Sequence, residues 1–146
     1  MKFAIITSRF AEKSGRALDV LNSSCEQKLT ELKVEFEKFT VPGAFEIPTL
    51  AEKILASNPW KSSGQRNFDG VICLGVVVRG ETAHFDLVAG NCARKIADLG
   101  VEFAQPVIFG VLTTETTEQA EARAERGAEF AQAAIDLAQE LGKIGS

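Results

Sequence analysis

The stretch Val71-Ile72-Cys73-Leu74-Gly75-Val76-Val77-Val78, residues 71–78, is apolar almost without interruption. A strand with one face in water alternates apolar and polar residues, whereas a strand covered on both faces is a continuous apolar run. We therefore expect residues 71–78 to form a strand in the middle of a sheet that is covered on both sides.

The segments on either side of this run alternate between strand and helix patterns. The N-terminal side predicts a strand over 3–7, a helix over 18–32, a strand over 34–41, a helix with Pro48 in its first turn that reaches Leu55, and a polar surface loop over 58–67. The C-terminal side predicts a helix over about 84–99, a strand over 107–112 and a helix over about 117–141.

Strand and helix thus alternate four times, and right-handed crossovers turn such a chain into a parallel sheet with helices on both faces. The predicted fold class is α/β, a three-layer sandwich around a four-stranded parallel sheet. The sequence has no internal repeat, and its 146 residues fit one domain over 1–146.

Composition excludes several classes of partner and cofactor. The formal charge of −4 comes without a basic stripe, so nucleic acid is not expected. The apolar stretch at residues 3–6 is too short for a signal segment or a membrane span, which predicts a cytoplasmic protein with no membrane partner. Three widely spaced cysteines and one histidine cannot make an ordinary zinc site, so we expect buried, reduced thiols and no metal. Dinucleotide and P-loop signatures are missing, and no cofactor is expected.

Ligands of open parallel sheets bind beyond the carboxyl ends of the strands, where loops converge. Four loops should meet there, at residues 8–10, 41–46, 79–84 and 113–115. They contain an aromatic residue, a carboxylate beside a Gly-Ala turn, an Arg-Gly pair and the one histidine of the chain.

Each of these residues has a simpler interpretation beside the functional one. His84 could cap a helix or, with a pKa near neutrality, transfer protons. Phe10 and Phe45 could be core aromatics or could stack on a flat heterocycle. Glu46 could be a solvated first-turn carboxylate or an acceptor for sugar hydroxyls.

Two cationic stretches could hold an anion. Residues 79–82, Arg-Gly-Glu-Thr, offer a cation, a hydroxyl and backbone N–H groups beside a helix start, although Glu81 opposes an anion. Arg123 and Arg126 lie three residues apart on one predicted helix, where pairing with neighbouring glutamates is the simpler interpretation.

Three blocks of sequence, residues 41–48 (VPGAFEIP), 74–85 (LGVVVRGETAHF) and 106–115 (PVIFGVLTTE), resemble the lumazine synthase family across nearly the whole chain. The resemblance implies a flavodoxin-like fold and a cofactor-independent transferase of riboflavin biosynthesis. That family condenses 5-amino-6-(ribitylamino)uracil with 3,4-dihydroxy-2-butanone 4-phosphate, giving 6,7-dimethyl-8-ribityllumazine, phosphate and water. It also implies a homo-oligomer, either a pentamer or a pentamer-based assembly, with active sites between subunits and with riboflavin synthase as a further partner.

The resemblance also assigns roles to individual residues. Proton transfer falls to His84. The pyrimidine and its ribityl chain would contact Phe10, Ala44, Phe45, Glu46, Val76, Val77, Val78 and, from a neighbouring subunit, Phe109. The ketone phosphate would contact Glu81 and Thr82, and Arg123 would reach it across the interface.

This chain departs from the family pattern at two places. Ala11 stands where the family usually has asparagine, which removes one polar contact. Residues 123–127, Arg-Ala-Glu-Arg-Gly, are shorter than the family's Gly/Lys-rich segment. Either Arg126 takes the role of the family's phosphate-site lysine or the phosphate pocket is built differently.

Three other functions compete with this interpretation. A related archaeal type of riboflavin synthase is disfavoured by the intact block 43–47 and by His84. A non-catalytic ribityl-pyrimidine-binding or shell-forming homologue would keep the fold but lose turnover. A flavodoxin-like electron carrier is disfavoured because residues 9–12, Arg-Phe-Ala-Glu, replace the phosphate-binding loop after the first strand.

Overall fold

Four parallel strands in the order β2-β1-β3-β4 form the only sheet of the described part of the chain, residues 1–145 of a computed structural model. The strands are β1 (Lys2–Ser8), β2 (Glu35–Val41), β3 (Gly70–Val78) and β4 (Val107–Thr114). The helices are α1 (Ala17–Glu31), α2 (Ile47–Ala56), α3 (His84–Phe103), α4 (Thr117–Arg123) and α5 (Gly127–Ile144), with 3-10 turns η1 (Ala44–Glu46) and η2 (Ala124–Arg126). Ser146, the last residue of the predicted domain, lies outside the described residues.

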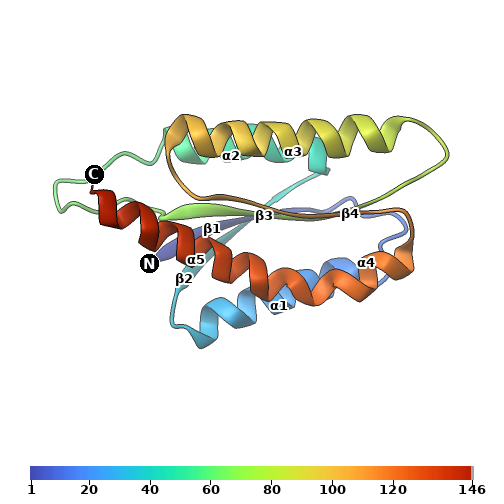
Figure 1. Cartoon of the computed structure of the whole chain (residues 1–146), viewed down its shortest axis with the longest axis horizontal. Coiled ribbons are helices and arrows are strands. Elements are labelled where there is room, and N and C mark those ends of the chain that lie inside the picture. Colours follow the sequence, from blue (N-terminus) through green and yellow to red (C-terminus); the bar gives the residue numbers. More distant parts are fainter. Residues whose placement is uncertain (146) are drawn as a thin grey trace.

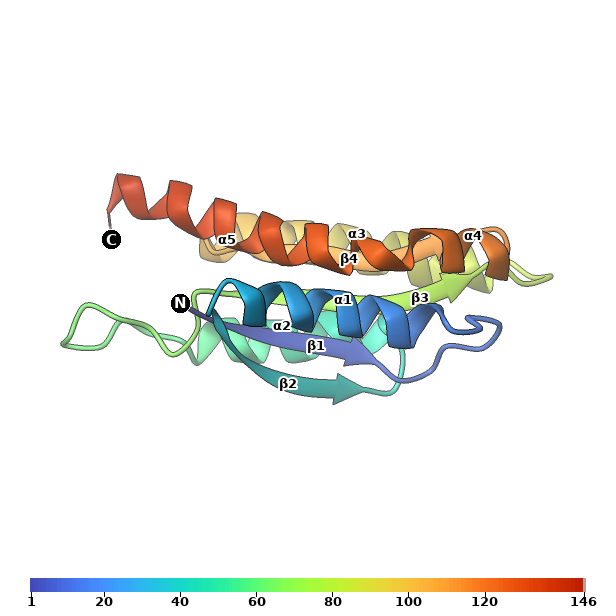
Figure 2. The same cartoon turned by 90° about the horizontal axis from the view of Figure 1, so that it is seen from below.

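Helices cover both faces of this sheet. Figure 1 shows the layers edge-on, with α2 and α3 on one side and α1, α4 and α5 on the other, and in Figure 2 the molecule is seen from the side of α1, α4 and α5, with α2 and α3 behind the sheet. All three neighbouring strand pairs are parallel. The predicted α/β class and the flavodoxin-like three-layer arrangement are confirmed.

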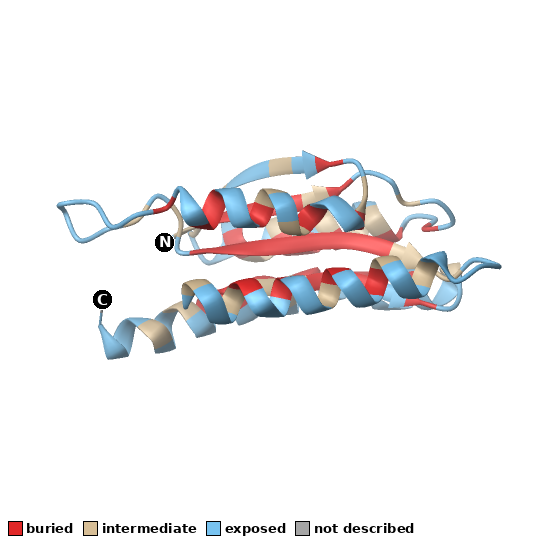
Figure 3. Cartoon of the chain, turned by 90° about the horizontal axis from the view of Figure 1, so that it is seen from above, coloured by how far each residue is buried: buried red, intermediate tan, exposed pale blue. Residues whose placement is uncertain are grey.

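The sheet separates two apolar cores. Phe3 and Ile72 belong to the cluster under α1 and α5, whereas Ile6 and Cys73 belong to the cluster under α2 and α3. β3 contributes to both clusters because successive side chains of a strand point to opposite faces. It is buried from Gly70 to Val76, as predicted for a central strand, and Figure 3 shows it red over most of its length.

The three cysteines are free and buried, as the sequence predicted. Burial raises the pKa of the Cys25 thiol to about 12 and that of Cys92 to about 11. Burial, with the nearby Cys92, also raises the pKa of Cys73. Within residues 1–145, no helix is long and apolar enough to cross a membrane.

The prediction of one continuous helix over 117–141 is wrong in its middle. The chain forms α4, a 3-10 turn over Ala124–Arg126 and then α5. The turn lies against α1, where the Ser24 hydroxyl donates to the carbonyl oxygen of Ala124 at 3.2 Å. Gly127 packs so closely on α1 that a Cβ atom there would overlap the carbonyl oxygen of Leu21.

Several predicted boundaries also move. Helix α3 continues to Phe103 and is capped by Ala104, which adopts a left-handed conformation. Helix α1 ends at Glu31, so Leu32 caps it. Thr113 and Thr114, predicted as loop, are the last residues of β4 because they pair with Val77 and Val78 of β3.

Candidate active site

A cavity of about 690 Å³ opens at the carboxyl ends of β1, β2 and β3, on the side of the sheet that α2 and α3 cover. This is the edge at which a parallel sheet is expected to bind ligands. It brings together nine of the predicted site residues: Phe10, Ala44, Phe45, Glu46, Val76, Val77, Val78, Thr82 and His84. The residues come from three of the four predicted loops and from the end of β3.

Phe10 and Phe45 form the aromatic part of the cavity lining. The backbone amides of Arg9 and Phe10 donate to the carbonyl oxygens of Val41 and Pro42 at 2.9 and 2.7 Å, which holds the loop after β1 against the loop after β2. Phe10 is 64% exposed and Phe45 53% exposed, so neither ring belongs to the core. Exposed aromatic faces in an open cavity are suited to stacking on a planar ligand.

Glu46 is fixed by the turn that carries it. Its Oε1 accepts a hydrogen bond from the backbone N–H of Gly43 at 3.0 Å, and its own N–H donates to the carbonyl oxygen of Gly43 at 3.1 Å. The turn is η1, which leads directly into α2 with Pro48 near its start. The carboxylate is therefore a pre-oriented acceptor at the cavity wall.

His84 is the first residue of α3 and lines the cavity. Its backbone N–H donates to Oγ1 of Thr82 at 3.3 Å, and the preceding Ala83 offers no capping side chain. The imidazole is exposed and so can exchange protons with water or with a ligand. Glu81, in the same loop, is exposed and does not line the cavity.

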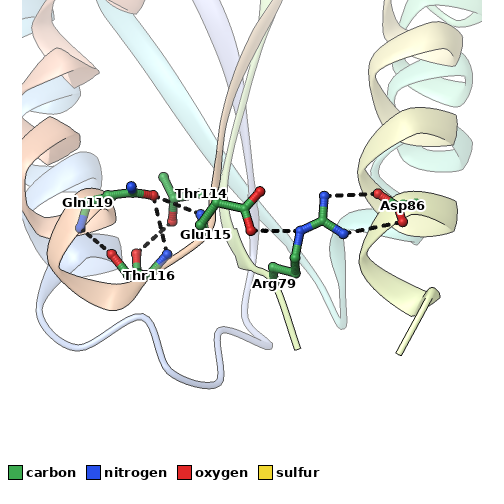
Figure 4. Close-up of polar contacts among 6 residues, drawn as sticks. All are labelled: Arg79, Asp86, Thr114, Glu115, Thr116 and Gln119. Atoms are coloured by element: carbon green, nitrogen blue, oxygen red, sulfur yellow. Dashed lines mark hydrogen bonds and ion pairs between the residues drawn. The ribbon is translucent and has the colours of Figure 1, made fainter. Parts of the chain in front are cut away.

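Arg79 is not available as a simple anion-binding cation. Its Nη2 lies 3.1 Å from Oδ1 of Asp86, and its Nε lies 2.8 Å from Oε2 of Glu115 (Figure 4). Hydrogen bonds to these two carboxylates raise the pKa of the guanidinium. If an anion binds at residues 79–82, groups other than the Arg79 guanidinium must hold it, because that guanidinium is already paired with two carboxylates.

Besides Glu81, three further predicted residues lie outside the cavity lining. Phe109 lies on the edge strand β4, where it pairs with Cys73 of β3, and it packs on the core under α2 and α3. Arg123 donates from Nη1 to the carbonyl oxygen of Gln119 at 3.0 Å, and Nε of Arg126 is 3.9 Å from Oε2 of Glu129. Both arginines belong to α4 and η2, which pack on α1 on the opposite side of the sheet.

The cavity also contains residues that the sequence did not single out. Leu87 and Val88 follow His84 by three and four positions on α3 and line the same wall. Their spacing from His84 could have predicted this, because residues three and four positions apart share one face of a helix. Glu12 and Lys13 also line the cavity, and Lys13 adopts a left-handed conformation with φ of 60°. Its carbonyl oxygen accepts a hydrogen bond from the Thr117 hydroxyl of α4, a long-range contact without a sequence signal.

Comparison with known proteins gives one consistent family. A family model described as 6,7-dimethyl-8-ribityllumazine synthase matches residues 1–141. A protein of that name from Desulfotalea psychrophila is 42% identical, over 94% of this chain and 86% of its own length. Proteins of the same name from Chloroherpeton thalassium and Chlorobaculum tepidum are 39% and 38% identical, over 93% and 94% of this chain and 86% and 87% of theirs.

Among solved structures, 4-deoxy-L-threo-5-hexosulose-uronate ketol-isomerase complexed with a tartrate aligns with all of this chain and 78% of that one. The TM-score is 0.39 and the sequence identity 11%, so this weak likeness assigns neither a fold nor a function.

Proposed function

The chain belongs to the 6,7-dimethyl-8-ribityllumazine synthase family, and from this premise we propose that the cavity at the carboxyl ends of the strands is its active site. The function is the lumazine synthase step of riboflavin biosynthesis, a transferase reaction. It condenses 5-amino-6-(ribitylamino)uracil with 3,4-dihydroxy-2-butanone 4-phosphate and releases phosphate and water. The observation that carries the proposal is that Phe10, Glu46 and His84, from three separate loops, line one cavity.

The pyrimidine substrate would occupy the part of the cavity beside η1. Phe10 would stack on its ring, and Ala44 and Phe45 would receive the ring and the start of the ribityl chain. Glu46 would accept hydrogen bonds from ribityl hydroxyls, a role supported by its fixed orientation on Gly43. The backbone of residues 76–78 would read the uracil edge.

The ketone phosphate would lie toward the loop 79–84, near Glu81 and Thr82. The amine of the pyrimidine and the ketone form an imine with loss of water, phosphate then leaves, and the carbon chain enolises, closes its ring and loses a second water. These steps need repeated proton transfer more than a strong nucleophile. His84 would supply that transfer, and holding two substrates together contributes much of the remaining acceleration.

Phe109, Arg123 and Arg126 would act from a neighbouring subunit, Phe109 on the pyrimidine and the two arginines on the phosphate. The proposal is supported by their position outside the cavity lining of their own chain. We propose a homopentamer or a pentamer-based assembly, in which an adjacent copy completes each site and an isolated subunit is inactive. Riboflavin synthase, which consumes the product, is the proposed further partner.

We propose that the reaction proceeds without a cofactor, because every step above is a condensation, an elimination or a proton transfer. The whole chain, 1–146, would act as one domain in the cytoplasm.

The decisive experiment mixes purified protein with both substrates and follows the fluorescence of the lumazine product. Arg123→Ala is measured beside the wild type, with Lys53→Ala as a control because Lys53 lies on α2 outside the cavity lining. We expect product from the wild type and from Lys53→Ala, and a large loss in Arg123→Ala. A well-folded oligomer that binds a ribityl-pyrimidine analogue but forms no product would overturn the enzymatic assignment.

A further inference from the structure

Arg79 is the first residue after β3, and a hydrogen bond of its backbone holds it at the edge of the sheet. Its N–H donates to the carbonyl oxygen of Thr114 at 2.8 Å, which extends the ladder between β3 and β4 past the end of β3. The side chain therefore starts from a fixed point at the sheet edge.

The guanidinium joins two other elements from this point. It makes a two-point contact with the carboxylate of Asp86, with Nη2 3.1 Å from Oδ1 and Nη1 3.3 Å from Oδ2, and Nε contacts Oε2 of Glu115 at 2.8 Å (Figure 4). Its plane also lies over the Phe85 ring, 4.4 Å from the ring centroid. A planar fork of donors suits this geometry, which an ammonium group cannot reproduce.

The backbone of Glu115, which carries the second carboxylate, is itself held in place. The backbone N–H of Glu115 donates to Oε1 of Gln119 at 2.9 Å. Gln119 in turn belongs to the capping box of α4, where its own N–H donates to Oγ1 of Thr116 at 3.1 Å. The contacts thus run continuously from the start of α4 to the start of α3, on both sides of the sheet (Figure 4).

The contact with Asp86 closes the loop that carries the site. Residues 80–83 connect Arg79 to α3 and are exposed, and the first residue of α3 is His84. Ala83 provides no side-chain cap, and the His84 N–H donates to Oγ1 of Thr82 at 3.3 Å. Tying Asp86 back to the end of β3 restricts the loop and the first turn of α3 together.

We infer that Arg79 is a positioning residue for the reaction, fixing His84 and Thr82 against the substrates by clamping the first turn of α3 to the ends of β3 and β4. Exposed ion pairs usually contribute little to stability. We therefore expect this clamp to affect the position of His84 and Thr82 rather than the free energy of unfolding. A small displacement of a proton-transfer group lowers turnover much more than it lowers binding. The inference rests on the proposed function, because it assigns His84 a role in that reaction.

The test compares Arg79→Gln and Arg79→Lys with a matched control, Lys38→Gln. Lys38 forms an exposed ion pair with Glu26 at 3.2 Å and does not line the cavity. Two readouts are used: kcat and KM for each substrate, and the NMR signal of the imidazole labelled with carbon-13. Since the chain has one histidine, that signal reports on His84 alone.

We expect Arg79→Gln to lower kcat by about 10-fold with little change in either KM, and to shift or broaden the His84 signal. Arg79→Lys should recover part of the loss, and Lys38→Gln should behave as the wild type. Asp86→Asn should add little to Arg79→Gln, because both changes release the same contact.

Unchanged kcat and an unchanged His84 signal in Arg79→Gln would overturn the inference. A raised KM for the phosphate substrate with kcat intact would do so too, since Arg79 would then bind substrate directly. If the wild type forms no product, the proposed function fails. The His84 signal still decides whether Arg79 holds that residue in place.

Discussion

Ser8 and Gly75 face each other across β1 and β3 so closely that a Cβ atom at Gly75 would overlap Oγ of Ser8. Ser8 is fully buried, and its hydroxyl has no hydrogen-bond partner within residues 1–145. Gly75 therefore has no room for a side chain, and the Ser8 hydroxyl beside it is an unsatisfied polar group. Gly75 lies one residue before Val76, where β3 begins to line the cavity.

Gly75→Ala should destabilise the protein by about 1–3 kcal/mol, because the added methyl has no space beside the hydroxyl. The double variant Ser8→Ala/Gly75→Ala should recover most of that loss, since Cβ of Ser8 would lie 3.5 Å from the new methyl group, an ordinary contact. Urea unfolding of the four proteins measures the coupling. Additive effects of the two substitutions would contradict this account.

Gly127→Ala should destabilise the protein by about 1–3 kcal/mol, because the new methyl would meet the backbone of α1 at Leu21 and Cys25. Gly142→Ala is the matched control in the same helix, with no atom within 4 Å of the added Cβ. Its unfolding free energy should stay level or rise slightly, as helix propensity favours alanine. Equal effects at the two glycines would argue against close packing of α5 on α1.

The three thiols should resist a disulfide-exchange reagent in the native protein at about pH 8 and all react after unfolding. Burial raises the pKa of each thiol above its unfolded value, so the buried protonated form contributes stability that is fully present below about pH 8.5. The contribution is lost as the pH rises through the folded-state values, about 11 for Cys92 and about 12 for Cys25. Rapid reaction of one thiol in the folded state would contradict this burial.

His84→Ala should lower kcat by about 100-fold without abolishing turnover, because holding the two substrates together acts independently of proton transfer. Size-exclusion chromatography and binding of a ribityl-pyrimidine analogue should match the wild type. Complete loss of activity in such a correctly assembled variant would show that proximity alone contributes little.

Much of the fold followed from local pattern. The apolar run 71–78 predicted a central strand, and β3 is buried from Gly70 to Val76. The carboxyl-edge rule predicted that Phe10, Glu46 and His84 lie in one region, and they line one cavity. The edge rule works because all strands of a parallel sheet end on the same side, whatever the lengths of the connections.

The failures share a cause. The helix predicted over 117–141 breaks at Ala124–Arg126, beside Ser24 and Leu21, about a hundred residues away in sequence. Asn58, predicted within a surface loop, is buried and donates from Nδ2 to the carbonyl oxygen of Phe68 and to Oε1 of Gln105, both at 2.8 Å. The periodicity of a segment indicates which of its residues are buried, but it does not indicate which residues from distant parts of the sequence pack against them.

The sequence by itself therefore determined the strand and helix order, the parallel sheet and the edge at which the site residues meet, because each follows from local periodicity and from chirality. Only the tertiary structure decided that Arg79 binds Asp86 and Glu115, that a 3-10 turn over Ala124–Arg126 interrupts the last helix and that Arg123 lies away from the cavity of its own chain. These outcomes depend on which side chains packing brings within reach of one another.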